Sequence, residues 1–181
     1  NLINKNLSEI LQCETNQIVN KNAEEIFINS KVVIDFTTPD SSLINIKLAQ
    51  ETKTPLVIGT TGLSSEIHKY ILDASNQIAL LQSSNMGLGV NLLFHLVQKT
   101  ASTLDDINYD IEIADTHHKH KIDAPSGTAI TLGEFASKGR KRNFDDVKVY
   151  DRTNKTGKRK TGEIGFSITR GGEIPGEHTV S

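Results

Sequence analysis

The sequence predicts an α/β protein with two domains, a parallel-sheet domain followed by an α+β domain whose sheet is mostly antiparallel. In the first half, short apolar runs alternate with amphipathic segments at close spacing, which is typical of a parallel sheet flanked by helices. Near the end of the chain, strand-like runs follow one another without helices between them. The pattern changes after Asn85, so we expect domains at residues 1–85 and 86–181.

The first half begins with a β-branched run, Lys31–Phe36 (KVVIDF), as expected of a buried parallel strand. The residues Pro39-Asp40-Ser41 then supply capping chemistry for an amphipathic helix. The polar, Asn-rich segment 1–30 matches no pattern that assigns it an element. The elements expected after the first strand are a helix at 42–51, a strand at 55–58, a helix at 64–74 and a strand at 78–81.

The second half opens with a longer helix at 88–100, where Val90, Leu93, Phe94 and Val97 recur at helical spacing. A strand at 109–114 leads into a polar loop at 116–126. The remaining expected elements are a helix at 127–135 and strands at 147–150, 164–169 and 178–180.

Composition excludes several classes of protein. Hydrophobic residues make up 36% and charged residues 23%, which is typical of a folded globular chain. A net charge of −2 gives no field that attracts nucleic acid or an anionic membrane, and no apolar run is long enough to span a bilayer. Cys13 is the only cysteine, which favours a reducing cytoplasm. The chain begins at Asn1 and stops at Ser181 within a strand-like stretch, so we expect both ends to be cut.

The residues best suited to catalysis or ligand binding lie between Asp115 and Thr128 (DTHHKHKIDAPSGT). Three histidines and two lysines occupy positions 117–121, directly after an expected strand. Histidine suits proton transfer near neutral pH, and a nearby lysine can bind a carboxylate or donate a proton. Ser126-Gly127-Thr128 opens a helix whose free N–H groups can bind an anion. Together these groups suit a small, doubly negative substrate that is protonated during reaction.

Other interpretations of the same residues remain open at this point. His117, His118 and His120 are candidate zinc ligands, although their spacing in a loop is not a well-attested metal pattern. The loop can also be solvated and without a role, and Ser126 and Thr128 can be ordinary helix caps.

The string HHKHKIDAPSGTA resembles the signature HHxxKxDAPSGTA of the dihydrodipicolinate reductase family and matches it at every fixed position. The resemblance implies that His117 is the acid/base group and that Lys121 donates a proton to the substrate. Many members have Glu-Ala where this chain has Asp115-Thr116. The resemblance also implies three substrate-binding residues, which are His118, Gly127 and Thr128.

Further segments resemble the same family in the same order, and they imply a Rossmann-like cofactor domain. They include the GTTG turn at 59–62, a strand end at 83–86, and the late segment RGGEIPGEH at 170–178. The family's N-terminal Gly-rich loop has no counterpart, since Gly59 is the first glycine, so we expect this domain to be incomplete. The implied cofactor is NADH or NADPH. The implied cofactor-binding residues are Phe36, Gly59, Thr60, Thr61, Ser83, Ser84, Asn85 and Met86.

The implied activity is NAD(P)H-dependent reduction of 4-hydroxy-tetrahydrodipicolinate, or of dihydrodipicolinate, in lysine and diaminopimelate biosynthesis. The substrate would be a cyclic imine dicarboxylate, and the second domain would bind it and form a cytoplasmic homotetramer. We expect the 181-residue chain alone to bind cofactor poorly. The alternatives are a truncated, non-catalytic assembly module, an oxidoreductase of the same plan with another substrate, and a metal-dependent hydrolase.

Overall fold

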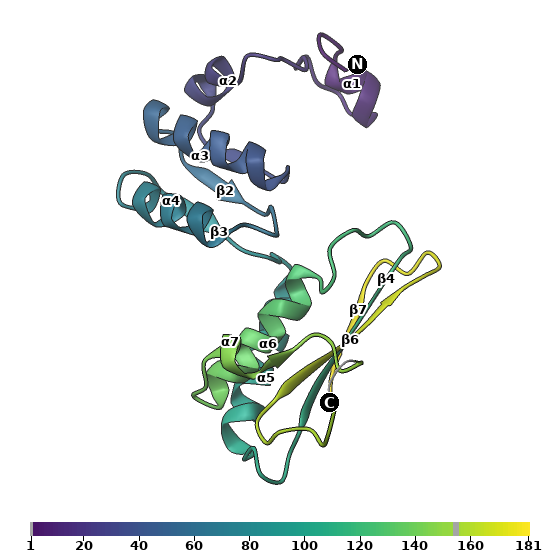
Figure 1. The fold of residues 1–181 in the computed structure, drawn as a ribbon. Coiled ribbons are helices and arrows are strands. Elements are labelled where there is room, and N and C mark those ends of the chain that lie inside the picture. Colours follow the sequence, from purple (N-terminus) through teal and green to yellow (C-terminus); the bar gives the residue numbers. More distant parts are fainter. Residues whose placement is uncertain (1, 154–155) are drawn as a thin grey trace. The chain divides into compact units, whose positions relative to one another are not determined.

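The computed structural model describes residues 2–153 and 156–181 (Figure 1). The chain forms two compact units that divide between Ser83 and Ser84, two residues before the boundary expected from the sequence. Each unit has its own hydrophobic core. No helix in the described ranges is long and apolar enough to cross a membrane.

The first unit is built on a parallel sheet with the order β1-β2-β3 (Figure 1). The strands are β1 (Val33–Asp35), β2 (Leu56–Ile58) and β3 (Leu80–Gln82), and the helices α3 (Pro39–Thr52) and α4 (Ser65–Ser75) connect them. One apolar face of each helix is buried in the core together with β2. The parallel sheet with intervening helices, expected from the alternation of patterns, is therefore confirmed.

Helix α3 begins three residues earlier than the sequence predicted. The side chain of Thr38 accepts a hydrogen bond from the N–H of Ser41, so Thr38 is the N-cap. Pro39 then occupies the first helical position, where its missing N–H costs nothing because that group would have no partner inside the helix. The Pro39-Asp40-Ser41 segment is thus the first turn of the helix.

Part of the unassigned N-terminal segment belongs to the first core. Two helices form there, α1 (Leu7–Leu11) and α2 (Ala23–Asn29), and an isolated bridge joins Asn6 to Ile18. Phe27 of α2 is buried in the core. The hydroxyl of Thr54 donates to the carbonyl oxygen of Phe27 at 2.9 Å, which fixes α2 beside the start of β2.

The second unit packs two helices, α5 (Leu88–Thr103) and α6 (Gly127–Gly139), along one face of a four-stranded sheet (Figure 1). The sheet order is β5-β6-β4-β7. A Cβ at Gly139 would lie 2.4 Å from the carbonyl oxygen of Gln98, so the glycine allows α6 to approach α5 closely. The remaining elements are β4 (Ile111–His117), α7 (Phe144–Val147), β5 (Lys148–Val149), β6 (Ile164–Arg170) and β7 (Glu177–Val180).

The second sheet is mixed, which differs from the mostly antiparallel sheet expected. Among the described strands, only the β4–β7 pair is antiparallel, whereas β4–β6 and β5–β6 are parallel. Parallel neighbours need a crossover of about a dozen residues or more. The chain between β4 and β6 contains α6, and residues 150–163 separate β5 from β6. A connection of this length is enough for a crossover, so the lack of a helical pattern in that part of the sequence did not require antiparallel pairing.

Candidate functional site

The carboxyl ends of β1, β2 and β3 lie at one edge of the first sheet. Their last residues are in register, because Asp35 pairs with Ile58, which pairs with Gln82. The residues that follow each strand therefore emerge at the same edge, where ligands bind in open α/β sheets. Five of the expected cofactor-binding residues follow these three strands in the first unit, and they are Phe36, Gly59, Thr60, Thr61 and Ser83.

The Gly59–Gly62 turn is held against the end of β1. A Cβ at Gly59 would lie 2.1 Å from the ring of Phe36, so the aromatic ring lies on the backbone of the turn. The hydroxyl of Thr60 accepts a hydrogen bond from the N–H of Thr37 at 2.9 Å, and Thr60 is buried. Phe36 itself is 65% exposed. This edge thus presents an open aromatic surface beside a tight turn.

The other expected cofactor-binding residues, Ser84, Asn85 and Met86, begin the second unit. The hydroxyl of Ser84 lies 2.8 Å from that of Thr131 in α6. The side-chain amide of Asn85 donates to the hydroxyl of Thr128 at 3.3 Å. The structure therefore joins two expected cofactor residues to the helix that carries the expected substrate residue Thr128. Met86 is exposed.

Strand β4 carries two ionisable residues on its buried face. Residues alternate between buried and partly buried along the strand, so Asp115 and His117 lie on the same face as Ile111 and Ile113. Asp115 is fully buried, and its Oδ1 lies 2.8 Å from Nδ1 of His117. His178 is paired with Asp115 across β4 and β7, and its Nε2 lies 3.3 Å from the same oxygen. One carboxylate oxygen therefore faces two imidazoles.

The second oxygen of Asp115 accepts two hydrogen bonds. The N–H of Ser126 donates at 2.7 Å and Nη2 of Arg170 donates at 2.9 Å. Burial raises the pKa of Asp115, but these hydrogen bonds and the guanidinium charge outweigh it and hold the pKa below its ordinary value. Asp115 is therefore a carboxylate at neutral pH.

For the two histidines, burial acts in the other direction and lowers the pKa. For His117, the nearby carboxylate of Asp115 opposes the effect of burial, whereas the charges of Lys121 and Arg170 add to it. Burial is the largest cause for His178 as well. The net direction is downward from 6.5 for both rings, so both are neutral near pH 7.

The loop after β4 forms a turn that carries His118 and Lys121. The N–H of Lys121 donates to the carbonyl oxygen of His118 at 3.2 Å, and the ring of His118 accepts from the N–H of His120. The ammonium group of Lys121 lies 2.8 Å from Oδ1 of Asp123, and the Lys121 side chain is partly buried. The ion pair with Asp123 therefore holds the Lys121 side chain in place.

The three loop histidines do not form the zinc site that was considered from the sequence. His117 turns toward Asp115, and the ring centroids of His118 and His120 are 6.1 Å apart. The group of metal-type donors that lies within 4.8 Å in the described chain is Asp115, His117 and His178. Because Arg170 already bonds this carboxylate, a second cation would meet electrostatic repulsion there.

Helix α6 begins where the expected substrate residues lie. Ser126 is the N-cap, and its hydroxyl accepts from the N–H of Ala129 at 3.2 Å. The same hydroxyl lies 3.0 Å from Nε2 of His178. Gly127 and Thr128 are the first two helical residues, so free N–H groups of the helix start are beside the ionisable cluster. The alternative interpretation as an ordinary helix cap therefore holds for Ser126, whereas Thr128 lies inside the helix.

The sequence had given no role to Asp115, Arg170, Gly176 or His178. The last three belong to the RGGEIPGEH segment, whose only sequence signal is its resemblance to the family. The alternation along β4 is a signal that would have placed Asp115 and His117 on one face. The pairing of β7 with β4, which brings His178 to that face, has no comparable local signal.

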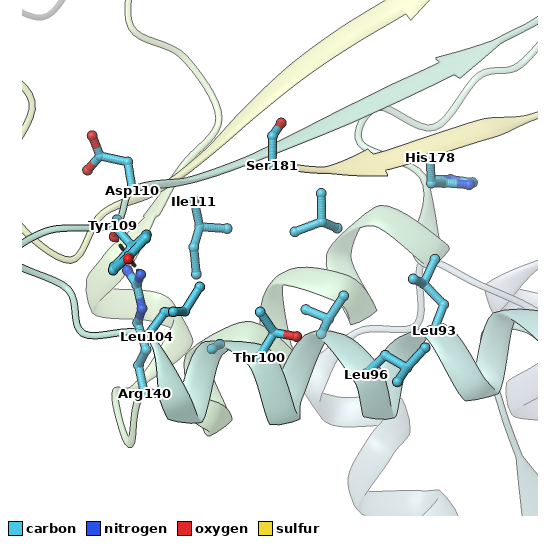
Figure 2. Close-up of a pocket in the computed structure, with 13 residues that line it drawn as sticks. Leu93, Leu96, Thr100, Leu104, Tyr109, Asp110, Ile111, Arg140, His178 and Ser181 are labelled. Carbon is cyan, nitrogen blue, oxygen red and sulfur yellow. Dashed lines mark hydrogen bonds between the residues drawn. The ribbon is translucent and has the colours of Figure 1, made fainter.

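A separate cavity lies between α5 and the face of β4 and β7 (Figure 2). Its volume is about 340 Å³ and its lining is largely aliphatic. Figure 2 shows Arg140 beside Tyr109 at one end, where the guanidinium donates to the carbonyl oxygen of Tyr109, and His178 at the other. None of the site residues expected from the sequence lines it. The cavity offers little to a doubly negative ligand.

Comparison with known proteins identifies both parts of the chain. A family model described as "Dihydrodipicolinate reductase, C-terminus" matches residues 89–181. Its counterpart, "Dihydrodipicolinate reductase, N-terminus", matches residues 1–86. The N-terminal match includes residues 1–30, which the sequence patterns had left unassigned.

Similar curated proteins carry the name 4-hydroxy-tetrahydrodipicolinate reductase. The protein from Polynucleobacter necessarius is 42% identical over 92% of this chain and 62% of its own length. The protein from Nitrosospira multiformis is 39% identical over 98% of this chain and 66% of its own length. The protein from Agrobacterium fabrum is 46% identical over 86% of this chain and 57% of its own length. The chain thus spans less than two thirds of the length of these relatives.

A similar solved structure is the dipicolinate-bound dihydrodipicolinate reductase from Paenisporosarcina sp. TG-14. Its TM-score is 0.63 with 22% identity, over 93% of this chain and 64% of that one. This likeness supports the α/β fold.

Proposed function

Because this chain belongs to the dihydrodipicolinate reductase family, we propose that it serves the NAD(P)H-dependent reduction of 4-hydroxy-tetrahydrodipicolinate, or of dihydrodipicolinate, to tetrahydrodipicolinate. The reaction belongs to lysine and diaminopimelate biosynthesis. One observation carries the proposal: His117 and the start of α6 contact the buried carboxylate of Asp115, and Lys121 lies close enough to His117 for its charge to act on that ring. A cytoplasmic homotetramer is part of the same proposal.

The substrate of this proposal is a small ring with two carboxylates. The ammonium group of Lys121 provides a fixed positive charge for one carboxylate. The free N–H groups of Gly127 and Thr128 at the start of α6 suit the other, because a helix N-terminus attracts negative charge. His118, in the turn before Lys121, provides a further hydrogen-bonding ring.

Proton transfer falls to Lys121 and His117. NADH or NADPH would supply the hydride when bound. Reduction then leaves charge on the ring nitrogen or carbon of the substrate, and a positioned proton donor removes it. Lys121 is cationic and can donate, whereas His117 is neutral near pH 7 and accepts or relays a proton at Nε2.

The cofactor-binding residues of this proposal follow the strands of the first sheet, with Ser84, Asn85 and Met86 at the start of the second unit. The exposed ring of Phe36 and the tight turn at Gly59 suit a flat nicotinamide ring and its ribose. Within the second unit, Ser84 and Asn85 lie within hydrogen-bond distance of Thr131 and Thr128 of α6.

Binding of dipicolinate (pyridine-2,6-dicarboxylate) to the 181-residue chain tests the proposal. We expect saturable binding by calorimetry and a loss of roughly 10- to 100-fold in affinity in Lys121→Ala, because a charge-assisted contact is removed. Lys119→Ala is the matched control, since Lys119 lies in the same loop but is exposed and pairs with Glu173.

Equal loss in the two variants would show that the loop binds the dicarboxylate only through its general charge. The absence of binding to a chain that is folded by circular dichroism would contradict the dicarboxylate site in this protein.

A further inference from the structure

We propose that Asp115 is a positioning residue that fixes the ring of His117 and, through Arg170, the loop that carries Lys121. The inference rests on the proposed function and deepens it, because it names what holds the two proton-transfer groups in a common frame. Asp115 lies at the junction of four elements, β4, β6, β7 and the start of α6.

The contact with Asp115 determines which nitrogen of His117 carries the proton. Oδ1 of Asp115 and Nδ1 of His117 lie 2.8 Å apart as a close ion-pair contact. Oδ1 of Asp115 has close contacts with both histidines, and Nδ1 of His117 has one with this oxygen. In the part of the chain that the structure describes, neither atom has a hydrogen-bond partner. A proton on Nδ1 would lie beside the carboxylate oxygen and stabilise this contact, whereas a proton on Nε2 would leave two lone pairs facing each other. The ring is therefore held with Nδ1 protonated and Nε2 free to accept.

The Nε2 side of the ring faces the turn between β6 and β7. A Cβ added at Gly176 would lie 2.8 Å from Nε2 of His117, and Gly176 has a φ of +157°. Glycine therefore allows the turn to approach this nitrogen closely. The carboxylate therefore contacts the ring on its Nδ1 side, and the Gly176 turn packs against its Nε2 side.

The second oxygen of Asp115 connects this ring to Lys121. Arg170 donates to Oδ2 of Asp115 at 2.9 Å and to the carbonyl oxygen of Asp123 at 2.7 Å, both from Nη2. The carboxylate of Asp123 in turn lies 2.8 Å from the ammonium group of Lys121. One guanidinium thus bridges the strand that carries His117 and the loop segment that ends beside Lys121.

The charges around His117 support a neutral ring. The facing groups are the carboxylate of Asp115 on the same strand, His178 on β7, Arg170 at the end of β6 and Lys121 in the loop. Two cations and burial oppose a positive imidazole, and one carboxylate favours it. With the proton on Nδ1, the ring accepts hydrogen bonds at Nε2, while Lys121 is left as the donor.

The test is ring-¹⁵N NMR of the histidines in the 181-residue chain across pH 5 to 8, without ligand. We expect His117 to carry its proton on Nδ1 at pH 7. In Asp115→Asn, the side-chain amide satisfies either ring nitrogen, so the Nε2–H tautomer should become substantially populated. The pKa of His117 should also fall further, because the carboxylate that raises it is gone.

The matched control is Glu112→Gln, which removes a carboxylate from the same strand. Glu112 lies on the opposite face of β4 and contacts Arg159, so the spectrum of His117 should stay as in the wild type. An Nε2–H tautomer in the wild-type chain overturns the inference, and this measurement stands even if Asp115→Asn fails to fold. A change in the wild-type spectrum on addition of a chelator also overturns it, because the cluster would then be a metal site.

Dipicolinate binding, measured on the same samples, separates the two proposals. Binding together with an Nε2–H tautomer on His117 refutes the positioning role and leaves the proposed function intact. A protonated Nδ1 without dipicolinate binding supports the fixed ring and counts against the proposed function.

Discussion

Replacement of Gly176 by alanine should disturb the ring of His117, because the added methyl group would overlap with it. The added Cβ would lie 2.8 Å from Nε2 of His117, where ordinary contacts begin at 3.4 Å, so an overlap of 3.4 − 2.8 = 0.6 Å must be relieved. A φ of +157° is also one that residues with a side chain rarely adopt. Backbone strain of this kind costs about 1–3 kcal/mol, and overpacking typically costs about 1–3 kcal/mol more.

We therefore expect Gly176→Ala to lower the free energy of unfolding by about 2 kcal/mol or more, which corresponds to a fall in Tm of roughly 8 °C or more for a unit of this size. Dipicolinate affinity should fall as well, since the ring must turn away from Asp115 or occupy the space for substrate.

Gly171→Ala is the matched control for this prediction. Gly171 lies in the same turn, and a Cβ there meets nothing within 4 Å. Thermal unfolding and calorimetry with dipicolinate on both variants give the comparison. If Gly176→Ala melts and binds like Gly171→Ala, the close approach of the turn to Nε2 does not exist and the reasoning is refuted.

The other predictions concern the charges of the same cluster. Burial lowers the pKa values of His117 and His178 below 6.5, so these histidines bind protons more tightly in the unfolded chain than in the folded one. Stability should therefore be lost as the pH falls below about 6.5. Urea unfolding at pH 7, 6 and 5 measures this loss, and a constant midpoint would contradict it. Arg170→Met should lower the free energy of unfolding by about 3–5 kcal/mol, because it leaves the buried carboxylate of Asp115 without its cation. Arg142→Met, which breaks an ion pair near the surface, should lower it far less in the same urea assay, and similar losses in the two variants would refute the distinction.

The order of helices and strands could be predicted because each element carries a local pattern. The apolar spacing of Phe94 and Val97 identifies α5, and the β-branched run before Phe36 identifies β1. The ends of elements were less predictable, since caps decide them. Thr38 caps α3 before Pro39, and α6 continues to Gly139 because a glycine fits its close contact with α5.

The pairing of the second sheet could not be predicted from these patterns. A strand shows which residues alternate, but its neighbour is chosen by packing with distant parts of the chain. The sequence therefore placed His117 and Lys121 in one loop region by their proximity in the chain. It gave no reason to choose Asp115 over His118 or His120 as the partner of the His117 ring.

The sequence by itself determined the family, the expected substrate and cofactor residues, and the strand-loop-helix order that presents them. Only the tertiary structure decided that Asp115 is fully buried, that Arg170 and His178 reach it from β6 and β7, and that Gly176 lies beside Nε2 of His117. These contacts join residues far apart in the chain, and they depend on the register in which β4 pairs with both neighbours. A shift of one residue would turn the buried face of β4 outward and separate the carboxylate from both histidines.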